Sequence, residues 1–207
     1  MYLRLGSLPI WPTWEKVAES MPQCFKEAYP STFCIIDATE MFCETPSSLP
    51  LQSQCYSNYK SHCTHKGLVA VAPNSAFIFI SELFNGAISD RELTVQSGFL
   101  QLLALVPKGK SVMADRGFEI QDLLLKYGIL LNIPPFREGD HLKEDDVTKT
   151  QTIARVRIHV ERVIGQVKQR YHILQQMIPL SLVGSVNQIW TVCCLLNNLR
   201  GPIIASA

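Results

Sequence analysis

The segment from Gln151 to Met177 reads QTIARVRIHVERVIGQVKQRYHILQQM and has a helical pattern of apolar side chains. They recur every three or four residues, which is the spacing of one buried face of a long α-helix. The pattern runs over Ile153, Val156, Val160, Val163, Val167, Tyr171, Leu174 and Ile178. We therefore predict a helix over the whole segment, with this face packed against the rest of the domain.

The polar side of this predicted helix is basic and contains one acid, Glu161. Six basic side chains accompany it between Val147 and Gln176, although the formal net charge of the whole chain is only +1. They are Lys149, Arg155, Arg157, Arg162, Lys168 and Arg170. Glu161 follows Val160 at the border of the apolar face, and a helix made only for solubility would mix its charges more evenly. A lone carboxylate there indicates a site whose other carboxylates lie elsewhere in the chain.

Composition limits the class of protein. The length and the 47% share of hydrophobic residues predict one domain with a sizeable core. Seven cysteines without a C-x-x-C pair are typical of free thiols in a reducing compartment. The N-terminus has no signal-peptide pattern. Asn187, Gln188 and Asn197 interrupt the apolar run near the C-terminus, which leaves no stretch of the ~20 residues that a membrane span needs. We expect a soluble intracellular protein with no membrane partner, in the nucleus or otherwise in the cytoplasm.

Strand and helix patterns alternate along the chain after an initial group of strands. We predict strands over 33–36, 55–60, 67–72, 76–83, 111–114 and 129–133. We predict helices over 12–28, 89–106, 119–127 and 182–199, and loops over 44–54 and 137–150. Alternation of this kind implies a partly parallel sheet with helices on its faces. The predicted fold class is α/β, with a mixed central sheet flanked by helices, preceded by a short helical lead-in over 1–29 and followed by a tail over 201–207.

Two of the short apolar strands are followed by an aspartate. Asp37 follows Phe33-Cys-Ile-Ile, and Asp115 follows Ser111-Val-Met-Ala. Catalytic groups gather beyond the carboxyl ends of parallel strands, and a helix packed on the sheet could bring Glu161 to the same point. Three carboxylates there would need a hard cation such as Mg²⁺ or Mn²⁺. The alternatives are ordinary, since an aspartate after a strand is often a turn or capping residue and a helical glutamate is often solvated.

Five blocks of sequence, in order along the chain, carry a family resemblance. They read IIDATE, YSNYKSHCTHKGLV, FIFISELFNGAISD, MADRGF and RIHVERVIGQVK. Together they resemble the catalytic domain of Harbinger-like DDE transposases, within the DDE superfamily of endonucleases, whose closest-looking members often carry a THAP-type zinc finger upstream. The resemblance covers roughly residues 30–200. It implies an RNase H-like fold in which Asp37, Asp115 and Glu161 are the catalytic, metal-binding acids. Asp90 matches a further recurrent acid, which we expect to cap a helix.

The resemblance also implies DNA as the substrate. The candidates for contact with DNA are Arg157, Arg162 and Lys168 on the long helix, and Lys60 and Lys66 in the earlier strand region. Basic side chains beside a scissile phosphate hold the substrate and balance its charge. The Cys55, His62, Cys63 and His65 group invites a zinc interpretation, but its spacing fits no common structural zinc site.

The function expected from the sequence is metal-dependent cleavage and strand transfer of DNA. Water would attack a phosphodiester and leave a 3′-hydroxyl, which could then attack a target strand. Residues 1–29 contain neither a Cys/His zinc module nor a helix-turn-helix pattern. We therefore expect a separate DNA-binding protein, or a homodimer, to supply site recognition. The alternative is a domesticated or truncated transposase-derived protein that binds DNA or a protein partner without catalysis.

Overall fold

The structure is a computed structural model that describes residues 1–133 and 161–200. Within them seven strands form one sheet. The strands are β1 (Thr32–Phe42), β2 (Tyr56–Ser57), β3 (His62–Val71), β4 (Phe77–Ile80), β5 (Phe84–Asn85), β6 (Ser111–Met113) and β7 (Leu130–Asn132). The order is β2-β3-β1-β6-β7, and β4 and β5 also pair with β3. β1 pairs antiparallel with β3 but parallel with β6, and β6 is parallel to β7, so the sheet is mixed.

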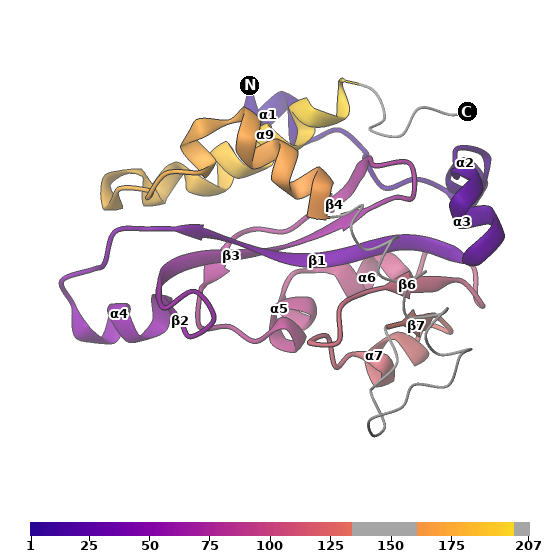
Figure 1. The fold of residues 1–207 in the computed structure, drawn as a ribbon, viewed down its shortest axis with the longest axis horizontal. Coiled ribbons are helices and arrows are strands. Elements are labelled where there is room, and N and C mark those ends of the chain that lie inside the picture. Colours follow the sequence, from indigo (N-terminus) through magenta and orange to yellow (C-terminus); the bar gives the residue numbers. More distant parts are fainter. Residues whose placement is uncertain (134–160, 201–207) are drawn as a thin grey trace.

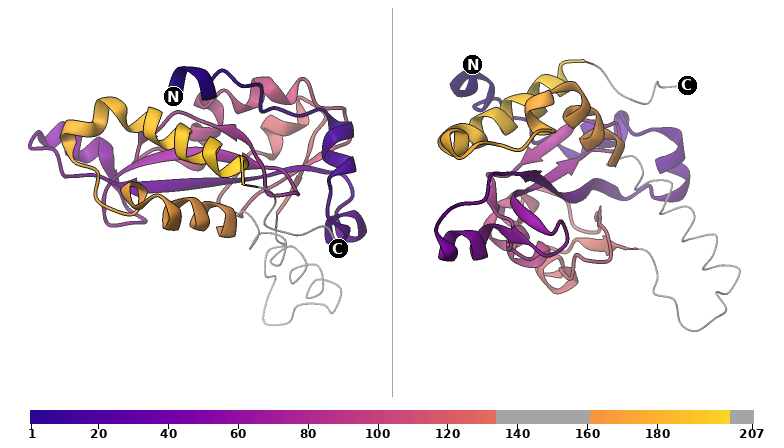
Figure 2. Two further views of the ribbon diagram at one scale, coloured as in Figure 1. Left: turned by 90° about the horizontal axis from the view of Figure 1, so that it is seen from above. Right: turned by 60° about the vertical axis from the view of Figure 1, so that its left-hand side comes forward.

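Helices cover both faces of this sheet (Figure 1). They are α1 (Tyr2–Leu5), α2 (Trp14–Glu19), α3 (Gln23–Ala28), α4 (Leu49–Cys55), α5 (Asp90–Gln96), α6 (Phe99–Leu103), α7 (Gln121–Leu125), a helix over 161–170 and α9 (Val186–Asn198). The helix over 161–170 lies with α9 on one face, and α5, α6 and α7 lie on the other (Figures 1 and 2). This arrangement confirms the predicted α/β class with a mixed, helix-flanked sheet, and it is consistent with an RNase H-like fold.

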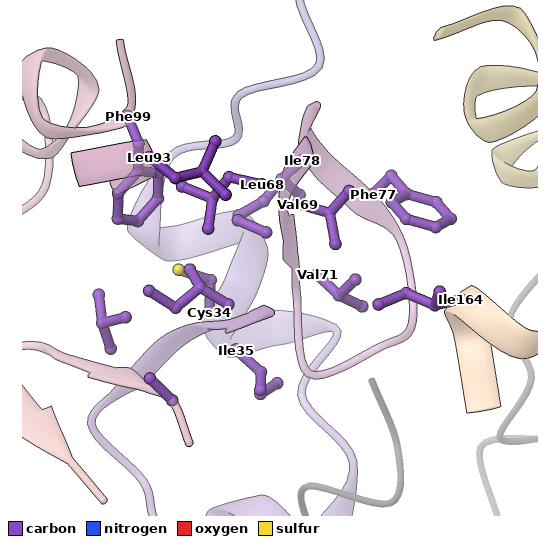
Figure 3. Packing of buried hydrophobic residues seen from close by; sticks show 14 of the residues in the cluster. Cys34, Ile35, Leu68, Val69, Val71, Phe77, Ile78, Leu93, Phe99 and Ile164 are labelled. Atoms are coloured by element: carbon purple, nitrogen blue, oxygen red, sulfur yellow. The ribbon is translucent and has the colours of Figure 1, made fainter. Parts of the chain in front are cut away.

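The two helical layers explain why β1 begins as an unbroken apolar run. Phe33, Cys34, Ile35 and Ile36 are all buried, as expected for a strand covered on both faces. Figure 3 shows the two sides of the neighbouring strand β3: Val71 faces Ile164 of the helix over 161–170. Leu68 lies instead toward Leu93 and Phe99 of α5 and α6. Successive side chains of β3 therefore pack alternately against the two helical layers.

The long helix ends earlier than its apolar pattern predicted. The described part is helical over 161–170, and the predicted residues 151–160 and the loop 137–150 lie outside the described residues. A 3₁₀ helix follows at His172–Leu174. The chain then returns to the end of β1, where the Ile178 amide donates to the Phe42 carbonyl at 2.8 Å. Apolar residues beyond Tyr171 thus pack beside a strand instead of continuing the helix, and the predicted end at Met177 is wrong.

Three other predicted elements differ from the structure. Residues 44–54 were expected as loop, but α4 forms there with Pro50 in its first turn, where proline costs no hydrogen bond. The predicted helix 12–28 divides into α2 and α3 at Pro22. The predicted helix 89–106 divides into α5 and α6 at Gly98, whose φ of 83° is left-handed and open to glycine at little steric cost.

One helical stretch among the described residues, Leu180–Asn198, is long and apolar enough to cross a membrane by length and composition alone. The sequence analysis expected no such stretch. It combines a 3₁₀ helix (Leu180–Ser185) with α9, and it packs on the sheet: Trp190 is buried, and Asn198 bonds both the amide and the carbonyl of Phe77 in β4 at 2.8 and 2.7 Å. Packing on the core accounts for the buried apolar side chains of α9, whereas Leu180 and Val183 of the 3₁₀ helix are exposed.

Candidate active site

Asp37 and Asp115, the acidic pair, follow the last paired residues of two neighbouring parallel strands. Ile35 of β1 is in register with Met113 of β6, and each aspartate lies two residues further along its own chain. Asp37 is inside β1, whereas Asp115 follows the end of β6 at Met113. Both aspartates therefore come just after the parallel pairing of β1 with β6, and their direct approach stays a prediction.

Asp37 is not at the end of its strand, as the apolar run suggested. β1 continues to Phe42 because its antiparallel partner β3 extends the pairing through Thr64. The parallel pairing with β6, however, stops at Ile35. Asp37 therefore lies just beyond the parallel part of the sheet, which is the position that the argument from strand ends requires.

The two aspartates have matching local hydrogen bonds. Oδ1 of Asp37 accepts the Ala38 amide at 2.9 Å, and Oδ1 of Asp115 accepts the Arg116 amide at 2.6 Å. The Phe118 amide donates to the carbonyl of Asp115 at 3.1 Å and closes a turn over residues 115–118. Both side chains are half-buried. Each carboxylate is thus anchored by one oxygen on its own backbone.

The side chain of Asp37 belongs to the face that carries the helix over 161–170. Asp37 is paired with Val69 of β3, and directly paired residues share a face of the sheet. Val69 is two residues from Val71, which faces Ile164 of that helix (Figure 3). Asp37 and the helix that carries Glu161 therefore lie on the same side of the sheet.

Lys168 fixes how far along β1 this helix lies. Its ammonium group donates to the carbonyl oxygen of Glu40 at 2.7 Å. Glu161 lies seven residues earlier, which is about 10 Å along a helix, or about three residues along a strand. The helix and β1 run in the same general direction in Figure 1. Glu161 therefore belongs near the level of Asp37, at the exposed start of the described helix.

Burial and neighbouring charges act on Lys168 together. Burial lowers the pKa of its ammonium group, and the positive charge of Lys60 lowers it further. The carboxylates of Asp37 and Glu40 raise it. These interactions link Lys168 electrostatically to Asp37, so the helix over 161–170 places a cation near Asp37 and also carries the acid Glu161.

The carboxylate oxygens of the candidate site suit a hard divalent cation, but the described residues do not form a complete set of metal ligands. Carboxylate oxygens are the ligands that Mg²⁺ and Mn²⁺ prefer. In the part of the chain that the structure describes, no three His, Cys, Asp or Glu side chains are grouped to hold a metal ion. Among the described residues the structure thus places Asp37 in β1, Asp115 after β6 and Glu161 on the covering helix, without grouping all three as ligands.

The other predicted DNA contacts occupy different settings. Lys60 and Arg162 are exposed, and the Lys60 ammonium lies 4.4 Å from the centre of the Tyr59 ring. Lys66 forms an ion pair with Asp90 at 2.6 Å on the opposite face of the sheet from Asp37. Arg157 lies outside the described residues. The contacts of these side chains with DNA stay predictions.

Asp90 does not cap its helix as expected. Ser89 is the cap of α5, and its side chain accepts the Glu92 amide at 3.1 Å, which confirms the predicted spacing of the capping residues. Asp90 is the first helical residue and pairs with Lys66. The sequence analysis missed this pair because 23 residues separate its members, and only the packing of α5 on β3 brings them together.

A mixed sheet flanked by helices on both faces is consistent with an RNase H-like fold. The family described as DDE superfamily endonuclease matches residues 36–198. The match covers most of the chain, and the chain belongs to this family. No curated protein matches it.

Proposed function

We propose that this domain cleaves phosphodiester bonds of DNA in a reaction that depends on Mg²⁺ or Mn²⁺, with Asp37, Asp115 and Glu161 as the metal-binding acids. The observation that supports the proposal is that Asp37 and Asp115 each come two residues after the last parallel pair of β1 with β6, Ile35 with Met113, while the helix that begins at Glu161 lies on the face of the sheet to which Asp37 belongs. Membership of the DDE superfamily endonuclease family supports the same assignment.

In this proposal the residues have distinct tasks. Asp37 and Asp115 hold the cation from the sheet, and Glu161 completes the ligand set from the helix. Two such ions supply an activated water and stabilise the leaving oxygen of the phosphodiester. Lys168 balances the charge of the acidic pair, and the exposed Lys60 and Arg162 bind phosphates of the DNA backbone. A side-chain nucleophile is not required.

The finer assignments are supported by sequence alone. The five blocks quoted above support a Harbinger-like subtype of the kind that is often linked to a THAP zinc finger. We propose a nuclear location, a domain that spans residues 30–200, and recognition of the DNA site through a separate DNA-binding protein or a homodimer.

Metal removal tests the function directly. Purified protein should nick supercoiled plasmid DNA in Mn²⁺, and EDTA should abolish the nicking, because the acids by themselves cannot activate water. Agarose-gel quantification of open-circular DNA measures the rate. A protein that binds DNA but never nicks it in Mn²⁺, even with a DNA-binding domain fused upstream, would support the rival function, a domesticated DNA-binding protein without catalysis.

Salt dependence tests the DNA contacts. Lys60→Ala combined with Arg162→Ala should reduce the slope of log affinity against log salt by about two, one unit for each lost phosphate contact. Lys168→Ala should change the slope by less than about one unit, because its ammonium is already bonded to Glu40. Lys26→Ala, an exposed lysine on α3, is the control. Fluorescence anisotropy at several salt concentrations gives the slopes, and equal slopes in all variants would exclude these contacts.

A further inference from the structure

The Lys66–Asp90 pair is a partly buried ion pair that joins β3 to the start of α5. The Lys66 ammonium lies 2.6 Å from Oδ1 of Asp90, and the two side chains are 13% and 27% exposed. The same ammonium donates to the carbonyl of Ile88 at 3.1 Å. Lys66 thus holds the segment that leads into α5 at two points. Such pairs often add little net stability over apolar residues, but they can hold two elements in one arrangement.

The second carboxylate oxygen of Asp90 lies against the turn that carries Asp115. A Cβ atom placed on Gly117 would be 3.3 Å from Oδ2 of Asp90, which is closer than most side chains tolerate. Gly117 is inside the turn that the Phe118 amide closes on the carbonyl of Asp115. Glycine is therefore the residue that lets the carboxylate approach the turn backbone.

The contacts form a continuous path to the acidic pair. Lys66 is in register with Glu40 of β1, three residues from Asp37. Asp90 connects Lys66 to Gly117, two residues after Asp115. One ion pair on the far face of the sheet thus ties the turn that presents Asp115 to the strand pair that presents Asp37.

We propose that Asp90 and Lys66 are positioning residues that hold the 115–118 turn, and so fix where Asp115 lies after β6; the importance of this placement for metal binding rests on the proposed function. Asp90 is not a metal ligand in this proposal, because Lys66 already neutralises it. Asp90 acts on the backbone of the turn through its contact with Gly117.

Hydrogen exchange of the Arg116 and Phe118 amides tests the turn without any enzymatic readout. Asp90→Asn should accelerate their exchange roughly ten- to hundred-fold, the range for loss of a hydrogen-bonded charged partner, and Lys66→Met should act in the same direction. Glu92→Gln is the matched control, since it removes an acid from the same helical turn while Glu92 contacts only Gln96 through its side chain in the described contacts. Equal exchange in Asp90→Asn and the control would overturn the proposal.

A double-mutant cycle keeps the test valid if one variant folds poorly. Gly117→Ala should accelerate exchange in the native background but have little effect in an Asp90→Ala background, where the obstructing carboxylate is gone. Additive effects would show that Asp90 does not act through Gly117 and would overturn the proposal. Hydrogen exchange can be measured even if the protein has no nuclease activity. A failure of the proposed function is therefore distinguishable from a failure of this inference.

Mn²⁺-induced thermal shifts separate a positioning residue from a ligand. Asp90→Asn should raise the Mn²⁺ concentration needed for the half-maximal shift by several-fold while retaining the full shift at saturation. If Asp90→Asn abolishes the shift as completely as Asp115→Asn does, Asp90 is a ligand and the positioning role is wrong.

Discussion

Asp115→Asn is expected to lower the rate of Mn²⁺-dependent nicking by about 10³-fold or more, which corresponds to about 4 kcal/mol of transition-state stabilisation. Asparagine keeps an oxygen that can accept the Arg116 amide, so the turn at residues 115–118 is preserved. It removes the negative charge that holds the cation, and the loss falls on the chemical step. Single-turnover nicking of plasmid DNA measures the effect.

The control for this prediction is Glu119→Gln, which removes an exposed acid four residues further along the same segment. Its nicking rate should stay near that of the native protein. Affinity for DNA should be unchanged or higher in Asp115→Asn, because a negative charge is lost beside the phosphates. Nicking by Asp115→Asn at a rate similar to the control would remove Asp115 from the site.

Asp37→Asn and Glu161→Gln should each cause a loss of similar size, and the Asp37→Asn/Asp115→Asn double variant should lose little more than either single variant. Residues that act as one unit are strongly non-additive, because the first substitution already destroys the shared site. Fully additive losses would indicate that the two aspartates serve separate functions.

Asp37 and Asp115 could be singled out from the sequence because the signal at each is local, and their role in the site stays a prediction. An apolar run followed by an acid marks a buried strand that reaches the edge of the core. The actual cause for Asp37 is different, since β1 continues and only its parallel pairing with β6 stops. The sequence could not distinguish these cases, because the length of β1 depends on β3, its antiparallel partner.

The end of the long helix and the Lys66–Asp90 pair could not be predicted. Apolar spacing of three or four residues continues beyond residue 170, but Ile178 bonds to the end of β1. The spacing of apolar residues indicates that they are buried, but it does not indicate which element they pack against. The ion pair has no local signal either, since a lysine on a strand and an aspartate at a helix start are both ordinary surface residues until the two elements pack.

Removing one carboxylate of the acidic pair should have opposite effects on the stability of the metal-free protein and on its affinity for the metal. In the proposed site the carboxylates of Asp37 and Asp115 are close enough to share a cation, so they repel each other when no cation is bound. Asp115→Asn should therefore have a metal-free Tm equal to or higher than that of the native protein. A lower Tm would mean that the charge of Asp115 has a structural partner whose loss outweighs the relief of repulsion.

In Mn²⁺ the native protein should instead have a higher Tm than Asp115→Asn. A concentration about 100 times the dissociation constant adds about 2.7 kcal/mol to the free energy of unfolding when only the folded chain binds the ion. In a domain of this size that raises Tm by roughly 5–10 °C. Asp115→Asn should lose most of the increase, and Glu92→Gln should keep it. Differential scanning fluorimetry of the three proteins, in EDTA and in Mn²⁺, measures the six Tm values. An equal Mn²⁺ shift in Asp115→Asn and the native protein would show that the ion binds elsewhere, because the proposed site cannot keep its affinity after losing one of its carboxylates.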